Sequence, residues 1–376
     1  MHRFVLFADN FSDEVIPGSP LSPYIFTFDP AGHDGTATAT ENNMTVSSVP
    51  FTTTTDGLFD HVKYLVYQSR SYVAPSCNYE IVYESVINAT QTLPTEIPYP
   101  DDLRGVNNAA ADPRVASSAL NVVDPDNFLV FDIMFTNQQI FAVYERLPIG
   151  RTATNNYCAF THLIPIGQCD PTTFTKVAIA YNKKAGYVRW LINGQEKFRV
   201  DRLGFPIDRK YRILDHGGIP SLIVPRNLLY GFGTFTLLDM YNPNNPGAEY
   251  NSGLLRLAGF PEFDPLLTTQ VGEPVPATFV QNVYDANFAL FGQGATMKLV
   301  YLTVYIQNSD CCQEGLPSPK CCNLLITQEY LNSLPGVLTS NAIYQCRYRR
   351  AESRIGKVDY NKIVYTKQDM RRFQRK

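Results

Sequence analysis

The sequence has few charges and no long run of apolar residues. Charged residues make up 18% of the 376 residues and hydrophobic residues 44%, whereas an average soluble domain has about 25% charged residues. This balance excludes disorder as the dominant state, because disordered chains combine few apolar residues with much charge. No stretch approaches the ~18 consecutive apolar residues of a membrane-spanning helix. The first apolar run, residues 4–8, is too short for the core of a secretory signal peptide, so none is expected.

The chain is rich in residues that favour strands and turns. It contains 23 Tyr, 23 Phe, 26 Pro and 23 Gly. Aromatic side chains are enriched in strands, whereas proline and glycine mark turns and interrupt helices. The composition therefore argues against a helical bundle and favours an all-β fold.

Strand-like runs recur along the first 306 residues. Residues 127–135 are almost continuously apolar, as in a strand buried on both faces. Asn193-Gly194 predicts a hairpin between 187–192 and 195–200, because both turn positions tolerate positive φ. The other predicted strands are 24–28, 61–67, 79–86, 139–145, 158–164, 177–181, 231–238 and 296–306. Together they predict a two-sheet antiparallel sandwich.

A change of composition after Gln307 predicts a boundary between a sandwich, 1–307, and a Cys-rich, basic extension, 308–376. The extension holds the candidate disulfide cysteines Cys311, Cys312, Cys321, Cys322 and Cys346. Disulfides would staple an irregular segment, but free thiols and a zinc site are also open. Two Cys-Cys pairs fit the usual zinc spacing, Cys-x₂₋₄-Cys, poorly.

The end of the chain is basic and the rest is acidic. Residues 347–376 contain eleven Lys/Arg and three Asp/Glu, which gives them a net charge of +8. Because the whole chain has a net charge of −3, the preceding 346 residues have a net charge of −11. The tail is either a solvated terminus or an arm that docks on an acidic partner, such as a neighbouring copy. The candidate docking residues are Arg347, Arg349, Arg350, Arg354, Lys357, Arg371 and Arg372. Nucleic acid is a weaker candidate partner, because no nucleic-acid-binding module is evident.

Five segments carry a family resemblance: FDIMFTN (131–137), IFAVYERLP (140–148), AIAY (178–181), VRWLING (188–194) and VDRLG (200–204). They resemble the concanavalin A-like jelly-roll superfamily of legume lectins, laminin-G-like modules and laminarinase-type glucanases. Within it, the chain is similar to a family of uncharacterised concanavalin-like domains in bacteria, fungi and some viruses. The resemblance covers residues 75–306 and implies a two-sheet jelly roll, but says little about function.

The resembled glucanases carry a Glu-x-Asp-x-(x)-Glu strand, because retaining hydrolysis needs two carboxyl groups about 5 Å apart. Asp132 matches the middle acid, but Val130 occupies the nucleophile position. Met134, or Phe135 if the strand bulges, occupies the acid/base position. We therefore expect no enzymatic activity and a hydrogen-bonded, structural role for Asp132. Trp190, the single tryptophan, is expected in the core rather than exposed as a sugar-stacking platform.

Two other segments carry acidic residues that could form a site. Glu80 and Glu84 share one strand face about 13 Å apart, too far for glycosidase chemistry, and are expected on an exposed or rim surface. The Asp124–Asn127 segment could offer oxygens to calcium, but a turn entering a strand is favoured. No cofactor is therefore expected, and calcium is the single candidate.

These observations favour a non-catalytic structural or assembly protein, such as a virion, fibre or surface-layer component. Its partner would be a second copy or an assembly protein contacted by the basic tail, and its location a virion or an extracellular assembly. The alternative is a lectin module that binds glycans, which rests on the fold resemblance alone. An atypical glycoside hydrolase is a distant third.

Overall fold

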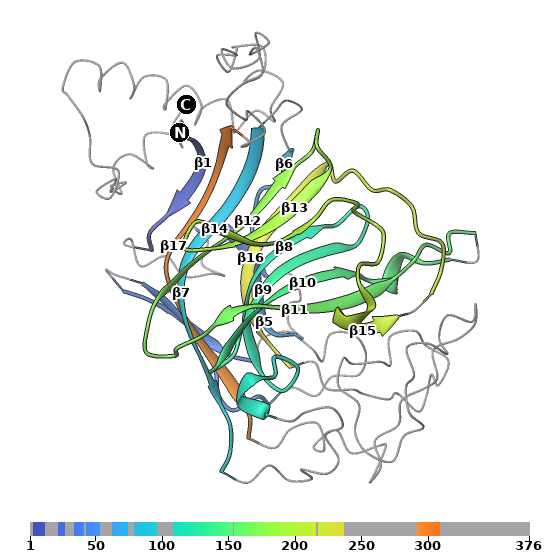
Figure 1. Ribbon diagram of the computed structural model, residues 1–376. Coiled ribbons are helices and arrows are strands. Elements are labelled where there is room, and N and C mark those ends of the chain that lie inside the picture. The colour runs from blue at the N-terminus through green and yellow to red at the C-terminus, as the bar shows by residue number, and fades with distance from the viewer. Residues whose placement is uncertain are drawn as a thin grey trace, which may run out of the picture.

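The computed structural model describes residues 3–11, 22–26, 34–40, 43–52, 62–73, 79–95, 108–152, 154–215, 217–236 and 292–308. These residues form two antiparallel β-sheets that face one another across an apolar core (Figure 1). The all-β, two-sheet sandwich predicted from the sequence is confirmed. The predicted extension, 308–376, lies outside the described residues apart from Asn308.

The first sheet has eight strands. In spatial order they are β14 (Gln195–Val200), β13 (Tyr187–Ile192), β12 (Thr175–Asn182), β7 (Tyr79–Thr92), β17 (Gly294–Asn308), β4 (Met44–Ser48) and β3 (Thr36–Ala39), and β1 (Arg3–Asp9) pairs with β17. The longest strands, β7 and β17, lie side by side near its middle, as Figure 1 shows. Residues more than 200 positions apart in the chain are therefore neighbours in this sheet.

The second sheet has nine strands. In spatial order they are β15 (Arg212–Asp215), β11 (Phe160–Gln168), β10 (Gln139–Arg146), β9 (Leu129–Phe135), β8 (Ser117–Asp124), β16 (Asn227–Phe235), β5 (Val62–Gln68) and β2 (Tyr24–Phe26), and β6 (Tyr72–Val73) pairs with β16. The described residues also form the short 3₁₀ turns η3 (Ala109–Ala111), η4 (Pro148–Gly150) and η5 (Arg209–Tyr211). The sequence analysis missed β8, in which Ser117, Ser118 and Asn121 interrupt the apolar pattern although all three are buried.

Strand β9 shows how the sequence builds the core. Its odd-numbered residues, from Leu129 to Phe135, belong to the apolar cluster between the sheets. Its even-numbered residues, from Val130 to Met134, point to the opposite face, because successive side chains alternate along a strand. Burial of each large apolar side chain stabilises the fold by about 1.5–3 kcal/mol.

Trp190 connects the two sheets. Its side chain is fully buried, at 0% exposure, which confirms the prediction that it lies in the core. From β13 it packs edge-on against the Phe131 ring of β9. Its indole Nε1 donates a hydrogen bond to the backbone oxygen of Asp132 at 2.9 Å. A side chain of one sheet therefore holds the backbone of the other at the residue that matches the glucanase acid.

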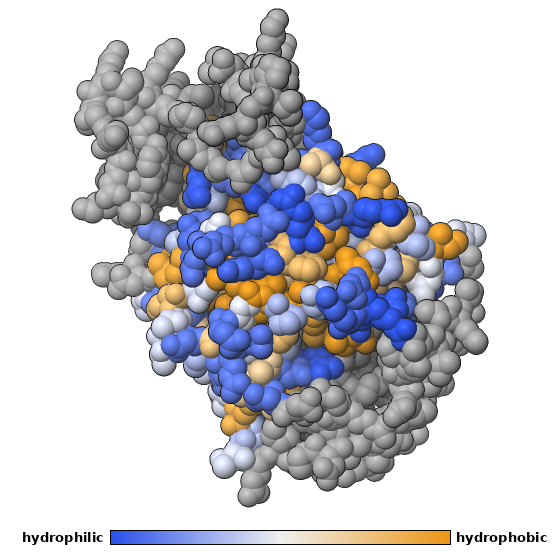
Figure 2. All heavy atoms as spheres, in the orientation of Figure 1, coloured by the Kyte–Doolittle hydropathy of each residue, from blue (hydrophilic) through white to orange (hydrophobic). Residues whose placement is uncertain are grey.

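The predicted hairpin is confirmed at the edge of the eight-stranded sheet. Asn193 and Gly194 have φ angles of 53° and 77°, and join β13 to β14. The return strand is polar and mostly exposed, and hydrophilic side chains gather over this part of the described surface in Figure 2. Charged side chains on an edge strand discourage pairing with another sheet.

Candidate functional site

The face of the nine-stranded sheet turned away from the core carries the residues that match the glucanase positions. Val130, Asp132 and Met134 lie on this face of β9 and are buried. The alternative acid/base position, Phe135, faces the core instead. Val130 and Met134, which the sequence resemblance set at the glutamate positions, are thus buried apolar side chains.

A second carboxyl group approaches Asp132 from the neighbouring strand. In the register of β9 with β10, Val143 lies opposite Asp132, and Glu145 lies opposite Val130. Asp132 and Glu145 are therefore diagonal neighbours on one face, with Cβ atoms about 7–8 Å apart by sheet geometry. Glu145 was not predicted from the sequence, because a pair of carboxylates on two neighbouring strands leaves no motif within either strand. The hairpin turn between 135 and 139 could have revealed it, since that turn sets the register.

The environment of this pair favours the protonated acids. Removal from water, and then the charge of Glu145, raise the pKa of Asp132 well above its usual range. Asn121 on β8 donates its Nδ2 hydrogen bond to Asp132 Oδ1. Removal from water also raises the pKa of Glu145 to about 7. The hydrogen bond that Thr161 Oγ1 donates to Glu145 Oε1 at 2.6 Å acts in the opposite direction and lowers this pKa. Asp132 is thus a buried, hydrogen-bonded acid, as expected.

The surroundings of the acid pair are mainly apolar. A buried cluster on this face contains Leu65, Tyr67, Ala119, Met134, Val143, Leu163 and Phe235. Burial, followed by the charge of Asp132, raises the pKa of Tyr67 well above its usual value. Asp132, Glu145 and Tyr67 thus lie on one face beside hydrocarbon side chains, and neither acid forms an ion pair with a cation of the described residues.

The outward face of the eight-stranded sheet corrects one prediction. Glu80 and Glu84 were expected to be exposed or on a rim, but their exposures are 0% and 6%. Glu80 forms an ion pair with Arg189 on β13. It also accepts hydrogen bonds from the Tyr187 hydroxyl at 2.6 Å and from Gln307 Nε2 at 3.1 Å. The prediction was wrong because these partners come from strands more than 100 residues away in the sequence.

Glu84 is satisfied in the same way. Lys176 Nζ on β12 lies 3.0 Å from its Oε1. The hydroxyls of Tyr301 and Tyr305 on β17 donate to its Oε1 and Oε2 at 2.8 and 3.1 Å. Burial alone would lower the pKa of Arg189, but the hydrogen bond and charge of Glu80 raise it. The two acids of this sheet are therefore held in ion pairs.

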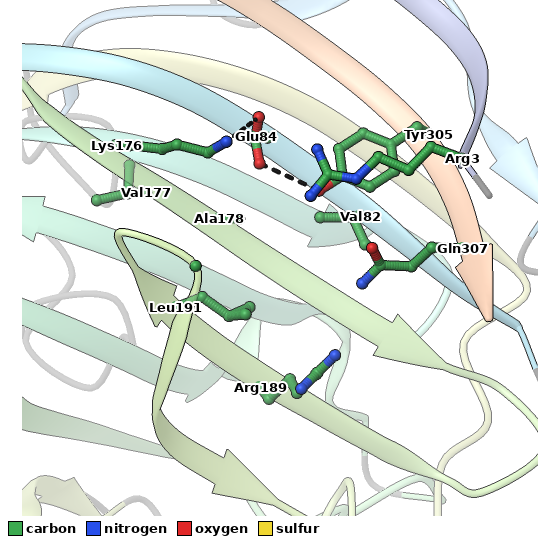
Figure 3. A pocket seen from close by; sticks show the side chains of 11 residues that line it. Arg3, Val82, Glu84, Lys176, Val177, Ala178, Arg189, Leu191, Tyr305 and Gln307 are labelled. Carbon is green, nitrogen blue, oxygen red and sulfur yellow. Dashed lines mark hydrogen bonds and ion pairs between the residues drawn. The ribbon is translucent and has the colours of Figure 1, made fainter. Parts of the chain in front are cut away.

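A hollow of about 110 Å³ opens beside these pairs. Figure 3 shows Lys176 and Arg3 reaching toward Glu84 from opposite sides, with Arg189 and Gln307 further along the hollow. The lining residues are Arg3, Val82, Glu84, Lys176, Val177, Ala178, Arg189, Leu191, Gly194, Tyr305 and Gln307. The hollow thus combines cationic and polar groups with an apolar floor.

The candidate calcium segment forms a turn. Asp124 Oδ1 accepts hydrogen bonds from the backbone N–H groups of Asp126 and Asn127, and its Oδ2 accepts from Asn127 Nδ2 at 2.7 Å. Asp126 Oδ2 accepts from Asn227 Nδ2 at 3.0 Å. The carboxylate oxygens are therefore engaged by N–H donors, which is the turn favoured from the sequence. Within the described ranges, no three His, Cys, Asp or Glu side chains form a group that could hold a metal ion.

The predicted docking and disulfide residues lie outside the described residues. These are Cys311, Cys312, Cys321, Cys322, Cys346, Arg347, Arg349, Arg350, Arg354, Lys357, Arg371 and Arg372. Of the other cysteines, Cys158 and Cys169 are free thiols. No helix among the described residues is long and apolar enough to cross a membrane.

The two antiparallel sheets are consistent with a concanavalin-like jelly-roll sandwich. The chain belongs to a family described as "Family of unknown function (DUF6081)", whose model matches residues 9–308. The uncharacterised protein L829 of Acanthamoeba polyphaga mimivirus is 31% identical over 360 residues, which cover 74% of this chain and 82% of that protein. The expectation of an uncharacterised family with a viral member is confirmed.

Solved structures show a more distant likeness. A non-specific endo-β-1,3(4)-glucanase of family GH16 aligns with a TM-score of 0.38 and 8% identity, over 81% of this chain and 91% of that chain. The β-glucanase of Bacillus licheniformis aligns with a TM-score of 0.36 and 8% identity, over 79% of this chain and 96% of that chain. The Emp47p carbohydrate recognition domain aligns with a TM-score of 0.34 and 6% identity, over 81% of this chain and 96% of that chain.

Proposed function

We propose that the protein is a non-catalytic structural or assembly component, such as part of a virion, a fibre or a surface layer. The observation that carries the proposal is the use of its acids. Glu80 and Glu84 are engaged by the sandwich's own donors. On β9, buried Val130 and Met134 occupy the positions of the glucanase glutamates. These groups serve the sandwich itself, which favours a scaffold over a hydrolase.

The viral relative supports an assembly role without defining it. A match to a protein of Acanthamoeba polyphaga mimivirus places a member of the family in a virus. A virion or an extracellular assembly is the location that we propose for this chain. Its large aromatic and aliphatic core is suited to a rigid building block, since close-packed interiors resist deformation.

The basic tail is the proposed contact with a neighbouring subunit. Its balance of +8 complements the −11 of the preceding residues, so two copies attract one another without a foreign partner. Contacts between exposed charges weaken with salt, because charges are screened within about 8 Å at physiological ionic strength.

Sedimentation of the full chain tests this proposal. We expect an oligomer at low salt, and at least a tenfold weaker association after charge reversal of four tail residues. The tail variant changes Arg347, Arg349, Arg350 and Arg354 to Glu. A matched control applies the same change to four exposed cations of the sandwich: Lys184, Lys197, Arg202 and Arg226. Equal association of the wild type and the tail variant at all salt concentrations, with and without reductant, contradicts a tail-mediated assembly.

The alternative function is a carbohydrate-binding module. The hollow of the eight-stranded sheet, which has polar groups around an apolar floor, is the observation that favours a binding role. A glycan array with the full chain separates the two functions. Glycan binding that is lost when the hollow is filled supports the module, whereas salt-sensitive self-association without glycan binding supports the assembly role.

A further inference from the structure

The hollow on the eight-stranded sheet follows from a row of small residues in β12. Ala178 pairs with Leu191 of β13 on one side and with Glu84 of β7 on the other. The next outward residue, Ala180, pairs with Arg189 and Val82 in the same way. At Ala178 a methyl group is flanked by the longer side chains of Leu191 and Glu84, and all three residues line the hollow. The hollow is therefore built into the pattern of side-chain sizes in the sheet.

The acceptors around the hollow are already used by the protein. Both oxygens of Glu84 accept hydrogen bonds from tyrosine hydroxyls, and its Oε1 also meets Lys176 Nζ. Both oxygens of Glu80 likewise accept hydrogen bonds, from the Tyr187 hydroxyl and from Arg189 and Gln307. A cationic ligand would therefore have to displace the protein's own donors.

The rim of the hollow carries two cationic side chains, Lys176 and Arg3. The Lys176 side chain is 37% exposed and pairs with Glu84, and an ammonium group carries three N–H donors. The Arg3 guanidinium lies 4.5 Å from the centre of the Tyr305 ring, at the opposite side of Glu84 in Figure 3. A ligand that enters here meets two cations and must supply hydrogen-bond acceptors.

The floor sets the second requirement. Val82, Ala178 and Leu191 present hydrocarbon to the hollow, so part of the ligand is apolar. We propose that this hollow binds a small organic carboxylate, with its anionic oxygens toward Lys176 and Arg3 and its carbon skeleton on the floor. Inorganic phosphate can interact with the cations but has no apolar part to cover the hydrocarbon floor. A neutral amide can cover the floor but has no negative charge for the cations. The proposal is independent of the assembly role.

The test uses the full chain and isothermal titration with four probes. Propionate is the free acid and glucuronate the sugar-borne one, so the two sources of the carboxylate are distinguished. Propionamide removes the charge, and inorganic phosphate removes the apolar part. We expect one of the two carboxylates to bind at least tenfold more tightly than both propionamide and phosphate. Binding of propionamide or of phosphate that is as tight as binding of the tighter carboxylate overturns the proposal.

Two pairs of variants locate the site. Ala178→Leu fills the hollow and should abolish carboxylate binding. Its control, Thr303→Leu, places the same leucine side chain beside Glu84 on β17, at a residue outside the lining of the hollow. Lys176→Gln should weaken binding about tenfold, whereas Lys197→Gln on exposed β14 should leave it unchanged. If Ala178→Leu fails to fold, the lysine pair decides, and unchanged binding in Lys176→Gln rejects the site.

Discussion

The two sheets of the sandwich each carry a pair of acids on the face turned away from the core, and the pairs are stabilised differently. On the eight-stranded sheet, Glu80 and Glu84 lie beside Arg189 and Lys176. On the nine-stranded sheet, Asp132 receives an amide hydrogen bond from Asn121, and Glu145 a hydroxyl hydrogen bond from Thr161. The partners of the acids are cations on the eight-stranded sheet and uncharged donors on the nine-stranded sheet, where removal from water raises the pKa of both acids.

The largest loss of stability is expected when the cation of a buried ion pair is removed. Arg189→Met leaves Glu80 buried at 0% exposure without its ion-pair partner. Loss of one partner of a buried ion pair costs about 3–5 kcal/mol, because the remaining charge is uncompensated. Equilibrium unfolding in guanidinium chloride measures this loss.

Arg199→Met is the control for that variant. Arg199 pairs with Glu196 at a partly exposed site, 2.8 Å apart. An exposed pair contributes at most about 1 kcal/mol. Equal losses of stability in the two variants would show that the buried Glu80–Arg189 pair stabilises the fold no more than an exposed pair does.

The second experiment compares how stability responds to pH. The pKa of Glu145 is raised from 4.5 to about 7 in the folded protein, because the side chain is removed from water. Between those pH values the unfolded chain releases this proton while the folded chain keeps it. The contribution of Glu145 is therefore complete below about pH 4.5 and is lost as the pH rises to about 7. This contribution to the free energy of unfolding is at most about 3 kcal/mol. Glu145→Gln should therefore reduce the fall of stability with rising pH in this range.

Glu196, on the eight-stranded sheet, supplies the opposite sign. Burial alone would raise its pKa, but the hydrogen bonds from Arg199 and Arg189 lower it. Its contribution is present above the pKa of the unfolded chain and is lost as the pH falls through the lowered pKa. Glu196→Gln should therefore remove a gain of stability with rising pH. If both substitutions changed the slope of stability against pH in the same direction, the predicted difference between Glu145 and Glu196 would be wrong.

The sequence predicted those parts of the fold that depend on local patterns. The Asn193-Gly194 turn fixed β13 and β14 to the residue, and the apolar neighbours of Trp190 predicted its burial. The acidic sites depend instead on pairing between distant strands. Glu80 was placed on an exposed or rim surface because Arg189 and Gln307 lie far along the chain. A search of single strands can find neither such partners nor a diagonal pair.

The smallest expected effect concerns Asp132. Removal from water, and then the charge of Glu145, raise its pKa well above the usual range, which favours the neutral acid in the folded protein. Asp132→Asn replaces one neutral side chain by another of nearly the same shape. The new amide oxygen can still accept the hydrogen bond that Asn121 donates. We therefore expect a change of at most about 1 kcal/mol in the free energy of unfolding at pH 7.

The same variant also tests whether Asp132 has a catalytic role. In a hydrolase, loss of this carboxyl group would reduce activity by orders of magnitude, whereas in a scaffold it changes only stability. The measurement is β-glucan hydrolysis by the wild type and by Asp132→Asn, alongside unfolding of both. We expect no hydrolysis above the buffer rate in either protein. Hydrolysis by the wild type that disappears in the variant would make this face an active site. A loss of stability as large as that of Arg189→Met would show instead that Asp132 is charged, and the contrast between the two faces would fail.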